Sequence, residues 1–102
     1  MTYDEMADKM VAEEPSVTKS KMFGMPCLKL PNGKVFAGDF HGDMTFKLGK
    51  ATAAALKIPG AKEFEPMSGR PMRGWTLVPA SQSENWLELA HQAHQYVTET
   101  TK

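Results

Sequence analysis

The sequence predicts an α+β fold, an antiparallel sheet with helices packed on one face, in the order α-β-β-β-α-β-β-α. Three observations predict it. Apolar residues recur at helical spacing near both ends of the chain. Between these ends, short alternating segments are separated by glycine-containing turns, as in an antiparallel meander. The length of 102 residues and the hydrophobic share of 41% are typical of one globular domain, covering residues 1–102.

The first helix is expected over residues 3–13. Thr2 and Glu5 have the spacing of a capping box, in which each side chain bonds a free amide at the helix start. The apolar residues that follow on one face are Tyr3, Met6, Ala7, Met10 and Val11. Pro15 cannot continue a helix, so the chain must leave it there.

Residues 17–40 are expected to form the first two strands of a meander. Alternating apolar residues begin at Leu28, and Gly24 with Pro26 predicts a bulge or kink inside the first strand. Asn32-Gly33 has the positive-φ preference of a type I′ turn, which would connect this strand to the return strand over residues 35–40.

A second tight turn is expected at His41-Gly42-Asp43. It leads into the third strand, in which Met44, Phe46 and Leu48 alternate with Thr45 and Lys47. The three strands together are expected to form a three-stranded antiparallel meander.

The second half of the chain predicts a short helix, two strands and a long helix. Residues 51–56 are small enough to lie close to a sheet, and Pro59-Gly60 ends this helix. Strands follow at residues 62–65 and 74–78, separated by an irregular loop at 67–71. Ser81 and Glu84 have the spacing of a second capping box. The apolar face of the last helix is Trp86, Leu89, Ala90, Ala93, Tyr96 and Val97.

Charge is distributed unevenly, although the net charge is zero. Residues 19–73 contain ten lysines and arginines against four acidic residues, whereas residues 1–18 and 74–102 are acidic. One interpretation is that solvated lysines lie on a sheet face near acidic helices. The other is that the basic segment faces an anionic partner. The sequence does not decide between these two interpretations.

No set of residues predicts catalysis, a metal or a cofactor. His91 and His94 are three residues apart but lack a third ligand nearby in sequence. Cys27 stands beside a proline without an evident base, so we expect a buried thiol that packs as a small apolar side chain. We therefore expect a protein that is not an enzyme.

Two short segments, residues 21–27 and 69–75, combine glycine and proline with methionine, aromatic and cationic residues. This mixture is typical of contact surfaces. In one interpretation Trp75 faces inward from the last strand, and Arg70 and Arg73 pair with acidic residues of the helices. In the other, both segments form one binding surface. Its candidate residues are Lys21, Met22, Phe23, Gly24, Met25, Arg70, Pro71, Met72, Arg73 and Trp75.

Several motifs together resemble the TfoX/Sxy N-terminal domain family over residues 3–98. They are Met22-Phe23-Gly24, the segments 33–37 and 44–48, Phe64-Glu65-Pro66 and Gly69-Arg70-Pro71-Met72. The resemblance implies a domain similar to secretion-chaperone folds. It also implies a stand-alone member, without the C-terminal domain of the competence regulators that act with the cyclic-AMP receptor protein. The family has no established catalytic residues.

The sequence therefore predicts a non-enzymatic binding domain that makes protein–protein contacts in a regulatory setting, such as that of competence or transcription regulators. Two alternatives are direct nucleic-acid binding by the basic central segment, and a small-molecule site between the sheet and the alanine-rich helix. The sequence is also compatible with a homodimer in which two copies pair through a sheet edge. The single cysteine, the lack of a signal peptide and the lack of a long apolar run predict a cytoplasmic protein with no membrane contact.

Overall fold

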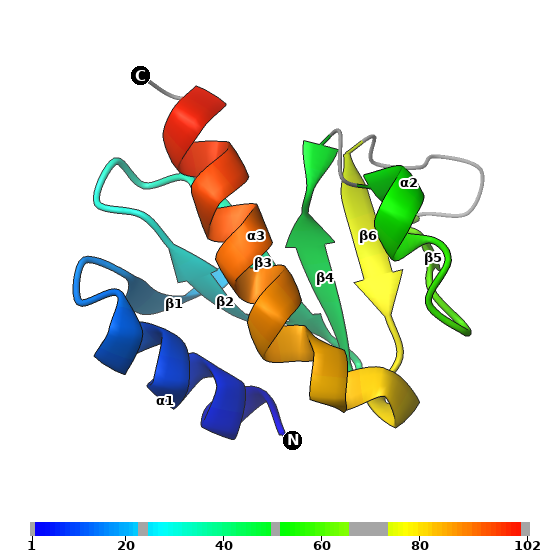
Figure 1. The fold of residues 1–102 in the computed structure, drawn as a ribbon. Helices are drawn as coiled ribbons and strands as arrows, with labels where there is room; N and C mark the ends of the chain where they lie inside the picture. Colours follow the sequence, from blue (N-terminus) through cyan, green and yellow to red (C-terminus); the bar gives the residue numbers. More distant parts are fainter. Residues whose placement is uncertain (1, 23–24, 50–51, 66–73, 101–102) are drawn as a thin grey trace.

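The computed structural model describes residues 2–22, 25–49, 52–65 and 74–100. Its centre is a six-stranded antiparallel sheet in the order β1-β2-β3-β4-β6-β5, and the helices pack on one face of it (Figure 1). The predicted α+β fold class is confirmed. The strands are β1 (Thr18–Met22), β2 (Met25–Lys29), β3 (Val35–Phe40), β4 (Asp43–Lys47), β5 (Lys62–Glu63) and β6 (Trp75–Val78). The helices are α1 (Tyr3–Glu13), α2 (Thr52–Ala55), the 3-10 helix η2 (Ala80–Asn85) and α3 (Trp86–Thr100).

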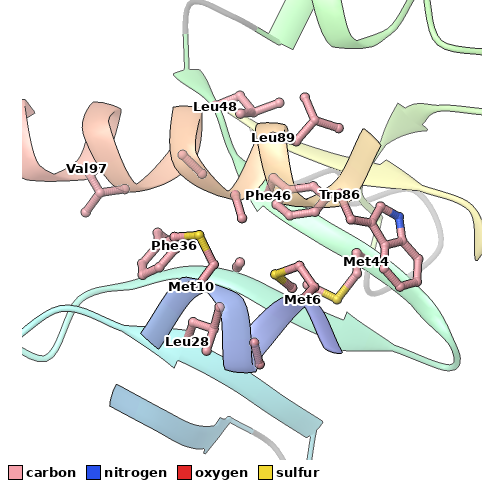
Figure 2. Packing of buried hydrophobic residues seen from close by; sticks show 14 of the residues in the cluster. Met6, Met10, Leu28, Phe36, Met44, Phe46, Leu48, Trp86, Leu89 and Val97 are labelled. Atoms are coloured by element: carbon pink, nitrogen blue, oxygen red, sulfur yellow. The ribbon is translucent and has the colours of Figure 1, made fainter. Parts of the chain in front are cut away.

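The main core fills the space between this sheet face and helices α1 and α3. Figure 2 shows Met6 and Met10 of α1 meeting Phe36 and Phe46 of the sheet, and all four side chains are fully buried. Burying a side chain of this size stabilises the fold by about 1.5–3 kcal/mol. The predicted apolar faces of the first and last helices are confirmed, because their residues make up the helix side of this core.

Helix α1 begins with the predicted capping box. The Glu5 amide donates to the Thr2 hydroxyl at 3.2 Å, and the Thr2 amide donates to the Glu5 carboxylate at the same distance. Each bond satisfies an amide that has no acceptor within the helix. The predicted bounds of 3–13 are confirmed.

The prediction of one kinked first strand is wrong. The chain reverses instead, and β1 and β2 are separate antiparallel strands in which Met22 pairs with Met25. Among the described residues, the meander therefore has four strands and the sheet has six. The physical reason is that β1 has no apolar alternation of its own. Pairing with β2 makes it a strand, and this cannot be read from local sequence.

The turn predicted at Asn32-Gly33 has a different type. The Gly33 amide donates to the Leu30 carbonyl at 2.9 Å, and Gly33 alone of this pair has positive φ, at 84°. Leu30 to Gly33 is therefore a type I turn followed by a glycine bulge, which Pro31 favours because its φ suits the second turn position. The turn at His41-Gly42 does have two positive φ values, 52° and 93°, as a type I′ turn requires.

The capping box predicted at Ser81 and Glu84 is also wrong. Both residues lie within η2, whose first position follows Pro79 without a side-chain cap, and α3 begins only at Trp86. The free Ala80 amide instead donates to the Asp43 carboxylate at 2.9 Å. An acceptor from the neighbouring strand thus replaces the local one. The loop predicted at 67–71 lies outside the described residues.

Replacing Gly49 by alanine is expected to destabilise the protein far more than the same change at Gly33. Both glycines have positive φ, which costs alanine about 1–2 kcal/mol. At Gly49 the new Cβ would also enter the Tyr96 ring, whereas at Gly33 it would meet nothing within 4 Å. The total loss at Gly49 should reach about 2–5 kcal/mol in chemical denaturation. Equal losses at the two sites would contradict this packing.

Candidate functional site

A second apolar cluster lies on the sheet face that faces away from the described helices. Phe64, Trp75 and Leu77 form it, with Val35 and Phe40 partly buried against them. Leu77 pairs with Thr45, which alternates with the core residues Met44 and Phe46 and so points to the other face. Trp75 is only 7% exposed. The structure therefore supports its interpretation as a packing residue of the last strand.

The predicted contact residues that the structure describes lie at two distant places. Lys21 and Met22 end β1 and Met25 begins β2, whereas Trp75 begins β6 and pairs with Lys47. Strands β3 and β4 separate β2 from β6, and the strand pairing puts Trp75 at the opposite end of the sheet from Met25. At strand spacings of roughly 4.8 Å and rises of roughly 3.3 Å per residue, the two positions are roughly 20 Å apart.

The other predicted contact residues, Phe23, Gly24, Arg70, Pro71, Met72 and Arg73, lie outside the described residues. A surface shared by the two segments stays a prediction for these positions. For the described positions, Trp75 does not join Lys21 and Met25.

Strand β1 is an outer strand of the sheet. It pairs with β2 on one side and with no other described strand, while β5, at the opposite border, has only two residues. Thr18, Lys19 and Lys21 are exposed and Ser20 is half-buried. Figure 1 shows β1 at the border of the sheet, beside α1. This strand is therefore the longer open edge of the sheet as described.

Pro26 determines which backbone groups of β1 point to this edge. In an antiparallel pair that exchanges hydrogen bonds, each residue must donate an amide, and Pro26 has none. The pairing of β2 with β3 begins only at Cys27, so the nitrogen of Pro26 faces the β3 side, where it has no partner. The pair of Lys21 with Pro26 is therefore of the other kind, in which both backbone groups of each residue point away from the partner. Since the pattern repeats every two residues, the amides and carbonyls of Lys19 and Lys21 point to the open edge.

The side chains of these two lysines share one side of the sheet. Lys19 pairs with Leu28, which belongs to the main core, so both lysines project on the helix side. The Lys19 ammonium forms an ion pair with Asp8 of α1, and the two side chains are 47% and 69% exposed. Ion pairs this exposed contribute about 0–1 kcal/mol, so the pair can be exchanged readily. Lysines at alternate positions are a recognised mark of edge strands, and this signal in residues 18–22 could have revealed β1.

A hollow of 480 Å³ lies beside β5 at the opposite border of the sheet. The ring centroids of Phe40 and Phe64 meet edge to face at 4.9 Å there, and His41, Asp43 and Lys62 contribute polar groups. Its volume is within the range of small-molecule sites. The hollow beside the alanine-rich helix, between α2 and α3, is only 150 Å³.

Cys27 is buried, and His91 and His94 contact side chains of other elements. Cys27 is 1% exposed, and burial raises the pKa of its thiol although nearby Lys29 lowers it. His91 lies 3.1 Å from a Glu13 carboxylate oxygen, and His94 meets the Phe36 ring edge to face. The predicted burial of Cys27 is confirmed. Within the described ranges, no group of three or more His, Cys, Asp or Glu side chains is placed to hold a metal ion.

No protein-family model, curated protein or solved structure matches the chain. The resemblance to the TfoX/Sxy N-terminal domain family therefore stays a prediction from its motifs. In the part of the chain that is described, no helix has the length and apolar character needed to cross a membrane.

The thiol of Cys27 is expected to react slowly with Ellman's reagent in the folded protein and quickly after unfolding. Because the pKa of this thiol is higher in the folded protein than in the unfolded chain, the free energy of unfolding also depends on pH. The unfolded chain loses the proton near the ordinary value of 9.0, while the folded chain keeps it to higher pH. Stability should therefore fall as the pH rises above about 9.

The variant Cys27→Ala is the control for this pH dependence, and its stability should fall less steeply at alkaline pH. Tyr3 contributes to the fall that remains, because burial raises the pKa of its phenol well above the ordinary 10.0. A thiol that reacts in the folded protein as fast as a free cysteine would contradict the burial of Cys27.

Proposed function

We propose that the chain is a non-enzymatic binding domain that contacts a protein partner through the open edge of β1. The carrying observation is that a five-residue outer strand directs the backbone groups of Lys19 and Lys21 away from the sheet. Such groups pair readily with an extended chain, which adds a strand to the sheet. The segment recognised in this way belongs to a protein, since only a polypeptide offers alternating amides and carbonyls at strand spacing.

Direct nucleic-acid binding has less support. Phosphate recognition needs cationic side chains free to replace counterions. On β1, Lys19 already pairs with Asp8 of the adjacent helix. The carbonyls of Lys19 and Lys21 that point to the edge would also find no donor on phosphate groups, which offer acceptors only. We further propose a regulatory role for the domain, which the resemblance of its motifs to the TfoX/Sxy N-terminal domain family implies.

A second candidate function is small-molecule binding in the hollow beside β5. The observation that favours it is the edge-to-face pair of Phe40 and Phe64 next to His41, whose positive φ of 52° is uncommon outside glycine. A fragment screen by NMR tests this directly. Shifts confined to Phe40, Phe64 and His41 would support it, and a screen without such shifts would remove it.

Replacing Lys21 by proline is expected to abolish partner binding while the domain stays folded. The lost amide points to the open edge, where proline is tolerated because no bond within the sheet is broken. The matched variant Lys21→Ala keeps this amide and should retain most of the binding. Circular dichroism reports the fold of each variant.

The partner for this measurement is first identified by crosslinking. A photo-crosslinking residue replaces Lys21, and the variant is crosslinked in its native cell. The same residue at the exposed Gln92 of α3 is the control. A protein that crosslinks at 21 and not at 92 is then purified and titrated against both Lys21 variants. Equal binding by Lys21→Pro and Lys21→Ala would exclude β1 as the site.

A further inference from the structure

We infer that the β1 edge selects an extended segment with carboxylate side chains two residues apart, and that Asp8 competes with this segment for Lys19. The inference rests on the proposed function and names the kind of partner segment that the edge accepts. It depends on the placement of two lysines and one aspartate.

Lys19 and Lys21 supply both the backbone groups and the charges of the edge. Their amides and carbonyls face an incoming strand, and their side chains project on the same side, two residues apart. Residues of the incoming strand that lie opposite them would have Cβ atoms roughly 4.5–5.5 Å away. Carboxylates at these two positions therefore meet a lysine each, whereas cationic residues there would be repelled.

A second copy of the chain is a poor occupant of the same edge. Antiparallel pairing of two β1 strands about Ser20 would put Lys19 of each copy opposite Lys21 of the other. Pairing about Lys19 would put this lysine opposite its own counterpart. Like charges directly opposite each other destabilise a strand pair, which is how lysine protects natural sheet edges. The charge pattern thus disfavours self-pairing and favours an acidic strand.

Asp8 holds the position that a carboxylate of the partner would take beside Lys19. The ion pair joins a helix to the strand edge through two exposed side chains, so exchange costs little. Removing the Asp8 charge frees Lys19 and also removes a negative charge near the incoming acid. An acidic segment should consequently bind more tightly when Asp8 is neutral.

The test uses three synthetic ten-residue peptides with blocked ends, in which threonine alternates with glutamate, glutamine or lysine. Fluorescence titration gives each affinity, and NMR hydrogen exchange reports the Lys19 and Lys21 amides. The glutamate peptide should bind roughly 2- to 30-fold more tightly than the glutamine peptide, as expected for two opposite-charge pairs. The lysine peptide should bind most weakly, and added salt should narrow the differences.

Two variants give effects of opposite sign. Asp8→Asn should tighten binding of the glutamate peptide, and Lys21→Glu should weaken it and remove its advantage over the lysine peptide, because each peptide then meets one like and one opposite charge. The control Glu88→Gln removes one negative charge from an exposed position on α3 and should change neither affinity. An unchanged affinity in Asp8→Asn would overturn the competition by Asp8.

The outcomes separate this inference from the proposed function. If the glutamate and glutamine peptides bind equally and both protect the Lys19 and Lys21 amides, the edge binds extended chains and the acidic selectivity is wrong. If no peptide protects these amides, both the edge site and its selectivity are wrong.

Discussion

The burial of one sheet face beneath α1 and α3 is the constraint on which the other features depend. Strand side chains alternate between the two faces, so the residues that fill this core fix the register of each strand. In β4, a slip of one residue would move Phe46 out of the core and put Lys47 into it. The cost of burying that ammonium excludes such a slip.

The same constraint makes β1 different from the other long strands. Residues 18–21 of β1 contribute no buried side chain to the main core, which receives Val17 just before the strand and Leu28 from its neighbour. Its place in the sheet therefore depends on backbone pairing with β2. Because the opposite row of backbone groups has no described strand beside it, the sheet ends in a border that can be extended.

The elements that the sequence predicts correctly are those decided by local chemistry. The Thr2 cap, the apolar spacing of α1 and α3, and the alternation of β4 each depend on residues within a few positions of one another. The failures have non-local causes. The reversal before Met25 depends on strand pairing, and the start of α3 depends on Asp43 from another strand. For the same reason, the distance between Trp75 and Met25 could not be predicted, because the order of the strands in the sheet sets it.

The role assigned to β1 depends on which of its amides are free, and residue-resolved hydrogen exchange of the unbound protein measures this most directly. We expect the exchange rates to alternate, with fast exchange at Lys19 and Lys21 and slow exchange at Ser20, which lies between them and bonds to β2. Slow exchange at both lysine amides would show that the edge is already occupied or paired differently, and β1 could then not bind a partner in this way.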